Sequence, residues 1–223
     1  FDKDGNLLFE HEIDKETIRK IFDAFNEYSM EPSLYTTEGR ISLLPLEERK
    51  IYTRDVFIPA IQVNHPDMEY TLDDFRELVD NVIFVDGQEA LLNSDHRILK
   101  ISSNSTDHEA LKKLRVELEK IPGLAVVSTV PTDIEITSVH AQKGSTLLDY
   151  AKRDGLTPDE IVAIGDSEND YSMLSIPGIH SVAMENACDM IRNICVYQTR
   201  ANTRDGIAYI INCILADREN FKL

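Results

Sequence analysis

The sequence predicts an α/β protein in two parts, with the boundary near residues 138–142. From about residue 143 onward, helix-like and strand-like segments alternate regularly, which is typical of a parallel sheet between layers of helices. In this part Ile161-Val162-Ala163-Ile164 is a continuous apolar run that ends in Gly165, as expected of a strand buried on both faces. Before the boundary, strand-like pieces outnumber helices, and the two do not alternate regularly. Residues 1 to about 138 are therefore predicted to form an α+β domain.

Three segments of the first part carry helix start signals followed by apolar residues at helical spacing. Asp14 can cap the first helix. Thr71, with Asp74 three residues on, can open the second, which is short. Thr106 and Glu109 have the spacing of a capping box at the start of the third. The residues expected to be buried are Ile18, Ile21, Phe22 and Phe25 in the first helix, Leu72, Phe75, Leu78 and Val79 in the second, and Leu111, Leu114, Leu118 and Ile121 in the third.

Short strand-like pieces lie between these helices. The last of them alternates cleanly, with Ile134 and Ile136 on one face and polar residues on the other. The stretch from Ile41 to Met68 contains three prolines and gives no clear pattern. The predicted strands are Leu7–Phe9, Ser33–Thr37, Asn81–Val85, Ile98–Ser102, Leu124–Thr129 and Asp133–Thr137.

The second part begins with a predicted helix over Lys143–Arg153. Thr157, Pro158 and Glu160 then supply a cap, a first-turn proline and a capping-box acid for one tight helical turn. The buried strand follows, and after it a short helix that ends at about Ser175. The remaining predicted elements are a strand over Ile179–Met184, a weak helix over Ala187–Arg192, and a helix over Asp205–Ala216 that buries Ile207, Ile210, Ile211 and Ile214.

Composition excludes several classes of protein. The chain has 223 residues, with 23 Lys plus Arg against 40 Asp plus Glu, and a net charge of −17. This acidity argues against nucleic acid or an anionic membrane as a partner, and no apolar stretch approaches the ~18 residues of a membrane span. The first five residues lack a signal-peptide layout. The three cysteines, Cys188, Cys195 and Cys213, show neither disulfide nor metal spacing, so we expect reduced thiols in a cytoplasmic protein.

The sharpest local feature is Gly165-Asp166-Ser167-Glu168-Asn169-Asp170, between the buried strand and the next helix. Open α/β sheets bind ligands at this carboxyl edge. Asp166 and Asp170 flank a turn, so their carboxylates can converge, and a cation would relieve their repulsion. A hard ion such as Mg²⁺ suits a site that shares its coordination with water and phosphate. The alternative is that Asn169 or Asp170 only caps the helix and that Asp166 is a solvated turn residue.

A second feature is Lys143, which opens a helix and is followed by Gly144. The helix dipole opposes a lysine at this end, whereas a bound anion would be attracted by both the ammonium and the backbone N–H groups. The alternative is a solvent-facing lysine that tolerates the small penalty. Together, Lys143 and the carboxylates would grip a phosphate and a metal, which fits phosphoryl transfer.

Two further segments, Glu185-Asn186-Ala187 and residues 202–206, follow strands and precede helices. Both are therefore candidates for helix caps. The amide of Asn186 could equally point toward the same sheet edge as the carboxylates. Asn202 and Asp205 are better explained as caps.

In their order and spacing, four blocks resemble the Cof-like branch of the haloacid dehalogenase superfamily. They are Lys143-Gly144, residues 164–174 around Gly165-Asp166, residues 182–187 with Glu185-Asn186, and Asn202-Thr203-Arg204-Asp205-Gly206. The resemblance is close over residues 139–223 and looser over residues 1–138. It implies the C-terminal half of a Rossmann-like catalytic core, residues 139–223, preceded by an α+β cap domain, residues 1–138.

The resemblance also implies roles for individual residues. Lys143 would stabilise the phosphate and the nucleophile. Asp166 would be a metal ligand, and Asp170 would hold the metal directly or through water. Asn169 would lie near the phosphate, and Asn186 would contribute to substrate binding. Glu185 stands where the family usually has a glycine, which puts the geometry of that loop in doubt.

Members of this branch use an Asp-x-Asp-Gly motif, whose first aspartate attacks phosphorus. Asp2-Lys3-Asp4-Gly5 matches it superficially, but only Phe1 precedes it to build the required strand. A hairpin turn is the alternative that we favour, because Asp-Gly between strand residues is a standard turn signal. We therefore expect the chain to begin inside a longer protein, with roughly 50 residues and the nucleophile upstream.

The resemblance thus implies a Mg²⁺-dependent phosphatase of small phosphorylated metabolites, such as sugar phosphates, that works through an aspartyl-phosphate. Two alternatives stay open. A non-catalytic binding module could retain the fold and lose the chemistry, and a mutase could transfer phosphate to an acceptor other than water. The sequence indicates neither the substrate nor the oligomeric state.

Overall fold

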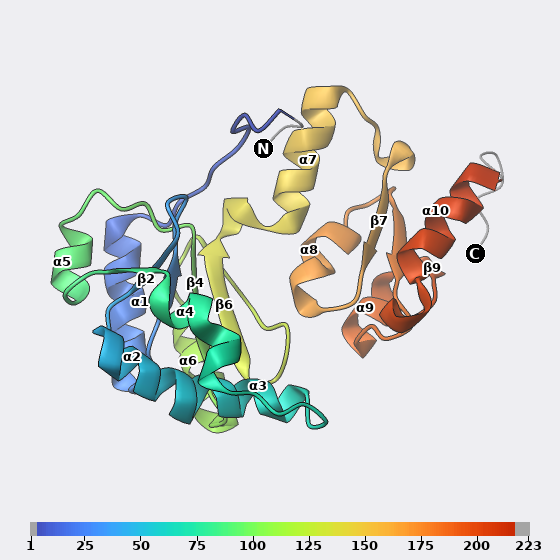
Figure 1. The fold of residues 1–223 in the computed structure, drawn as a ribbon. Coiled ribbons are helices and arrows are strands. Elements are labelled where there is room, and N and C mark those ends of the chain that lie inside the picture. The colour runs from blue at the N-terminus through green and yellow to red at the C-terminus, as the bar shows by residue number, and fades with distance from the viewer. Residues whose placement is uncertain (1–3, 217–223) are drawn as a thin grey trace. The chain divides into compact units, whose positions relative to one another are not determined.

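The computed structural model describes residues 4–216, and the chain divides into two compact units between Ala141 and Gln142 (Figure 1). Each unit has its own sheet and its own cluster of buried apolar residues. The architecture is α/β, as the sequence predicts. Among the described residues, no helix combines the length and apolar character that a membrane span requires.

The first unit is built on a six-stranded sheet in the order β3-β2-β1-β4-β6-β5. All neighbours are antiparallel except β2 and β3, which are parallel. Leu34 pairs with Ile41 on one side and Ile101 on the other, and Ile101 pairs with Ile136, so one face of the sheet is continuously apolar. The strands are β1 (Ser33–Tyr35), β2 (Arg40–Ser42), β3 (Val82–Phe84), β4 (Lys100–Asn104), β5 (Leu124–Val127) and β6 (Asp133–Ser138).

Three helices supply apolar residues to the cluster over this face: α1 (Lys15–Glu27), α5 (Gln88–Leu92) and α6 (His108–Leu118). Asp14 caps α1, accepting a hydrogen bond from the backbone N of Thr17 at 2.9 Å, as predicted. The cap of α6 is Asp107, whose carboxylate accepts from the backbone N of Ala110 at 3.0 Å. The prediction of a capping box at Thr106 was wrong by one residue, because two adjacent residues can both cap and the carboxylate does so here.

The unassigned stretch contains β2 and a nearly continuous run of helix. This run consists of α2 (Leu46–Tyr52), a π-helical turn η1 (Thr53–Phe57) and α3 (Ile58–Asn64). Its buried residues are Arg49, Thr53 and Ala60, so no stripe of large apolar residues marks it in the sequence. Arg49 donates to the backbone oxygens of Val79 and Leu44, at 2.5 and 3.0 Å. The short elements η2 (Leu72–Phe75) and α4 (Arg76–Asp80) follow, and Thr71 opens η2 as predicted, through a capping box with Asp74.

The second unit contains a parallel sheet in the order β7-β8-β9. Its buried cluster includes Ile161, Leu174, Met184 and Ile191. The strands are β7 (Val162–Gly165), β8 (His180–Ala183) and β9 (Tyr197–Gln198). The helices are α7 (Lys143–Asp154), η4 (Pro158–Glu160), η5 (Glu168–Asp170), α8 (Tyr171–Leu174), α9 (Asp189–Ile194), η6 (Asn202–Arg204) and α10 (Gly206–Ala216).

Burial in the second unit differs from the sequence prediction in two elements. In β7, Ala163 and Gly165 are buried while Val162 and Ile164 are only partly so, which means that one face of the strand is less covered than expected. In α10, Ile210 is fully buried, but Ile207 and Ile211 are 55% and 50% exposed. Gly206 lies so close to the backbone of Arg200 that a side chain there would collide with it. Contact through Gly206 and Ile210, four residues apart, leaves a narrow buried face on this helix.

The predicted strand Leu7–Phe9 does not form, and residues 4–12 contain no strand. A turn at Asp4 is followed by Gly5 with φ +83°, but residues 6–12 form no strand, so the expected hairpin is wrong for the described residues. Asp2, the alternative nucleophile of this motif, lies outside them. The three cysteines are free thiols.

Candidate active site

The loop after β7 is organised around the carboxylate of Asp170. Its Oδ2 accepts hydrogen bonds from the backbone N of Asp166 at 2.9 Å and of Ser167 at 3.2 Å. This reciprocal capping box closes the turn that opens η5. Gly165 is required at the end of β7, since a Cβ there would lie 2.6 Å from the Asp170 side chain. The loop therefore presents Asp166 at the carboxyl edge of the sheet and keeps Asp170 buried behind it.

Lys143, the first residue of α7, reaches the same carboxylate. Its Nζ lies 2.5 Å from Oδ1 of Asp170 and 3.3 Å from Oδ1 of Asn169. The lysine side chain is 50% exposed, whereas that of Asp170 is 7% exposed. Gly144 lets α7 approach α8, because its N donates to Oγ of Ser172 at 3.1 Å and a Cβ would strike the Ser172 backbone. An ammonium fixed on one side and open on the other can still contact an anion.

Asp166 is tied to the loop that follows β8. Nδ2 of Asn186 donates to Oδ2 of Asp166 at 2.9 Å, and Oδ1 of Asn186 accepts from the backbone N of Asn202 at 2.9 Å. The backbone oxygen of Asp166 accepts from the N of Cys188 at 2.9 Å. Asn186 thus bridges the ends of all three parallel strands, and it does not cap α9, whose N-cap is Cys188.

The predicted site residues therefore come together within one unit. Lys143, Asn169 and Asp170 are directly bonded, Asp166 and Asn186 are directly bonded, and the backbone of Asp166 joins the two groups. Asn202 is the first residue of η6 and donates its backbone N–H to Asn186, and Asp205 follows η6 with a left-handed φ of +53° before α10. Asp205 is therefore the C-cap of η6, and the N-cap of η6 is Ala201, so the prediction that Asn202 and Asp205 cap the starts of helices is not confirmed.

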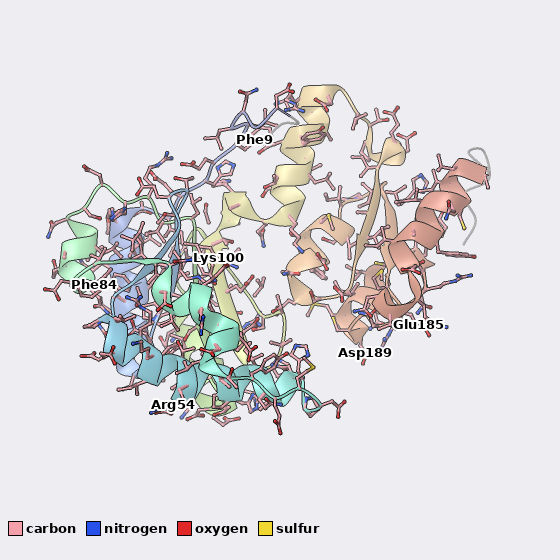
Figure 2. All side chains as sticks on the ribbon, in the orientation of Figure 1. Phe9, Arg54, Phe84, Lys100, Glu185 and Asp189 are labelled. Carbon is pink, nitrogen blue, oxygen red and sulfur yellow. The ribbon has the colours of Figure 1, made fainter. Side chains whose placement is uncertain are left out.

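Glu185 stands where the family resemblance leads us to expect a glycine, and its side chain makes contacts that a glycine could not. Its Oε2 accepts from the backbone N of Ala201 at 3.2 Å and forms an ion pair with Arg204. Glu185 is in the loop that joins β8 to α9 (labelled in Figure 2), and its side chain links that loop to η6. Sequence reasoning missed this clamp, although an acid and a base in two loops that the resemblance brings together were a usable signal.

The charges of the site bear on whether a cation fits. Asp170 is fully engaged by Lys143 and two backbone N–H groups. Asp166 is partly buried, and no described residue donates to its Oδ1. Residues 4–216 contain no group of three acidic, His or Cys side chains able to hold a metal ion. One free carboxylate oxygen fits a hard ion that takes most ligands from water and phosphate, and fits a protein-caged ion poorly.

Comparison with known proteins identifies the class. The family model of haloacid dehalogenase-like hydrolases matches residues 1–211. The 5-amino-6-(5-phospho-D-ribitylamino)uracil phosphatase YwtE of Bacillus subtilis is 35% identical over 128 residues, which are 57% of this chain and 44% of that protein. The chain thus spans less than half the length of this curated relative.

Two solved structures share the fold. A haloacid dehalogenase-like hydrolase from B. subtilis has a TM-score of 0.74 and 23% identity, over 95% of this chain and 74% of that one. The subclass IIB sugar phosphatase BT4131 has a TM-score of 0.66 and 20% identity, over 94% of this chain and 70% of that one.

Proposed function

This chain belongs to the haloacid dehalogenase-like hydrolase family, and from that premise we propose that the whole protein is a Mg²⁺-dependent phosphatase of small phosphorylated metabolites, such as sugar phosphates. The observation that carries the proposal is the bonded group of Lys143, Asp166 and Asp170 at the carboxyl edge of a parallel sheet. Phosphoryl transfer depends chiefly on positioning and charge neutralisation, and this group supplies both.

Each side chain has a distinct task in this proposal. Asp166, with one carboxylate oxygen unbonded to described residues, would hold the Mg²⁺. When bound, the ion neutralises phosphate oxygens. Lys143 shifts part of its ammonium contact from Asn169 to the phosphate, and Asp170 keeps the lysine in place. Asn186 orients Asp166, and we propose that Asn169 also contacts the substrate.

The attacking carboxylate is a separate matter. Asp170 is buried and bonded to Lys143, and Asp166 is assigned to the cation, so neither is placed to attack phosphorus. We assign the attack to an aspartate outside residues 4–216. Its oxygen forms a bond to phosphorus as the bond from phosphorus to the substrate alcohol breaks, and water then cleaves the aspartyl-phosphate. The first unit would serve as the cap that selects the organic half of the substrate.

The substrate class is supported by the relatives. The B. subtilis relative is named for a phosphorylated ribityl compound, and one structural neighbour is described as a sugar phosphatase. Both substrates pair a phosphate monoester with a small polyol. An acidic protein can bind such an anion because an ion and Lys143 dominate the local field.

The decisive test is phosphate release by the whole protein from an aryl phosphate and a panel of sugar phosphates, with and without Mg²⁺. Asp166→Asn should lower kcat/KM by at least about 100-fold, because the cation loses its charged ligand. Asp189→Asn, which changes a well-exposed carboxylate on α9, is the matched control and should leave kcat/KM unaltered. If Mg²⁺ with phosphate stabilises the protein thermally but no substrate turns over, the protein is a binding module and the proposal fails.

A further inference from the structure

The loop between β8 and α9 is held to the segment that leads into η6 at two adjacent points. Glu185, labelled in Figure 2, accepts a hydrogen bond through Oε2 from the backbone N of Ala201 at 3.2 Å. The next residue, Asn186, accepts through Oδ1 from the backbone N of Asn202 at 2.9 Å. Two consecutive side chains therefore bind two consecutive N–H groups, which fixes the position of one segment along the other.

Arg204, the last residue of η6, adds a charge to the first of these points. Its guanidinium forms an ion pair with Oε2 of Glu185, the same oxygen that accepts from Ala201. The backbone N of Arg204 donates to the oxygen of Ala201 at 2.9 Å, so the three residues form a closed ring of contacts. Both charged side chains are about half exposed, so the ion pair contributes little to stability. Its effect is instead on the geometry of the two segments.

The position of the Asn202 N–H determines how the amide of Asn186 is oriented. A backbone N–H can only donate, so it holds Oδ1 of Asn186, and the amide nitrogen is left to face an acceptor. That nitrogen donates to Oδ2 of Asp166 at 2.9 Å, whereas no described residue donates to Oδ1 of Asp166. A continuous series of contacts thus leads from the Glu185–Arg204 ion pair to one particular oxygen of Asp166.

We propose that Glu185 and Arg204 are positioning residues for Asp166, and that they act through the amide of Asn186 to set the affinity for Mg²⁺. In the proposed function, on which this inference rests, Asp166 holds the ion, and Asn186 leaves its Oδ1 available. Partners that orient a metal ligand typically change metal affinity by about 10- to 100-fold when removed. Glu185 and Arg204 lie one contact farther from the ligand, so we expect an effect of about 3- to 10-fold.

Electrostatics alone predicts the opposite sign for the loss of Arg204. Removal of a positive charge near a cation site would tighten Mg²⁺ binding, because like charges repel. If Arg204 positions Asp166, its removal instead weakens binding, because the carboxylate oxygen that meets the ion loses its fixed direction. Arg204→Gln is therefore the decisive variant. Glu185→Gly should also weaken binding, but both explanations predict that result.

The test is the binding of Mg²⁺ to the whole protein in the presence of inorganic phosphate, measured by calorimetry. Arg204→Gln should raise the Kd for Mg²⁺ by about 3- to 10-fold, and Arg204→Lys, which keeps the charge, should stay within about twofold of the parent. Arg153→Gln is the matched control, because it removes an arginine from an ion pair near the other end of α7 from Lys143. It should change the Kd by less than about twofold.

A second readout needs no metal. Nitrogen-15 NMR of the Asn186 side-chain amide, identified by its absence from Asn186→Ser protein, reports the bond to Asp166. In metal-free protein, Arg204→Gln should shift this signal and speed its hydrogen exchange, whereas Arg153→Gln should leave it unchanged. Glu185→Gln breaks the same ion pair and keeps an acceptor for the Ala201 N–H, so it carries this measurement if Arg204→Gln does not fold.

The proposal is overturned if folded Arg204→Gln binds Mg²⁺ as tightly as the parent or more tightly, or if the Asn186 amide signal is unchanged in the variants that break the ion pair. If the parent itself binds no Mg²⁺, the proposed function fails separately. The amide signal then decides alone: a shift supports the positioning of Asn186 by Glu185 and Arg204, and an unchanged signal refutes it.

Discussion

At the scale of single residues, the sequence predicted which side chains gather at the sheet edge but not how they divide the work. Asp166 and Asp170 are equivalent in the sequence pattern. In the structure Asp170 is buried and its carboxylate accepts three hydrogen bonds, while the carboxylate of Asp166 is partly buried and accepts one, from Asn186. The difference arises from the turn of η5, which points one carboxylate back at the backbone. Turn geometry of this kind is not encoded in residue spacing.

This asymmetry predicts the sign of a stability change in metal-free protein. Asp170→Asn removes the buried charge that compensates Lys143 and weakens two bonds from backbone N–H groups. It should lower the free energy of unfolding by about 2–3 kcal/mol, measured by chemical denaturation. If Asp170 acted only as a metal ligand, its removal would relieve repulsion with Asp166, and the variant would be as stable as the parent or more stable. Asp189→Asn should stay within about 0.5 kcal/mol.

Glu31 gives a second residue-scale prediction, on pH dependence. Burial, reinforced by the nearby charge of Glu48, raises its pKa from 4.5 to about 7 in the folded protein, so the folded state binds more protons than the unfolded state between these values. The contribution of Glu31 to stability is therefore full below about pH 4.5 and is lost as the pH rises through 7. Glu31→Gln should remove this slope, and it should be the more stable protein at about pH 8 by roughly 1–2 kcal/mol, after allowance for partial exposure. Denaturation curves across this pH range decide it, and an unchanged slope would contradict the assignment.

At the scale of elements, prediction succeeded for helices that bury large apolar residues in one core. It failed for helices whose buried residues are small or polar. Helix α1 places Ile18, Ile21 and Phe25 in the core and was predicted with its cap. The run from α2 to α3 buries Arg49 and Ala60 and contains a π-turn, so its sequence has no apolar period to read. Helix α10 fails in the opposite way. Its sequence has a clear apolar pattern, but among the described residues only part of that pattern is covered, and Ile207 and Ile211 remain exposed.

The cap of α6 tests this scale directly. Asp107→Ala removes the carboxylate that accepts from the Ala110 N–H and favours the positive end of the helix, so the first unit should lose about 1 kcal/mol of stability. Thr106→Ala, one residue earlier, is the matched control and should change it by no more than about 0.5 kcal/mol. Equal losses in thermal unfolding, or a larger loss from Thr106→Ala, would restore the capping box that the sequence suggested.

At the scale of the whole molecule, the two units have separate apolar clusters and separate sheets. The change of rhythm in the sequence near residues 138–142 corresponds to the division at Ala141 and Gln142. Assignment of the first unit as a cap and the second as part of a catalytic core still rests on the family resemblance. One property of this two-unit architecture can be tested without any substrate, namely whether the two units unfold independently.

Two independent cores predict two unfolding transitions in calorimetry. Asp107→Ala should lower the midpoint of one transition only, and Asp170→Asn should lower only the other, because each change is confined to contacts within its own unit. The double variant should show both shifts, with each equal to that of the single variant. A single transition moved by both substitutions would mean that the units unfold together. Their stability would then be a property of the whole chain, and a substitution in one unit would alter the chemistry of the other through its folding.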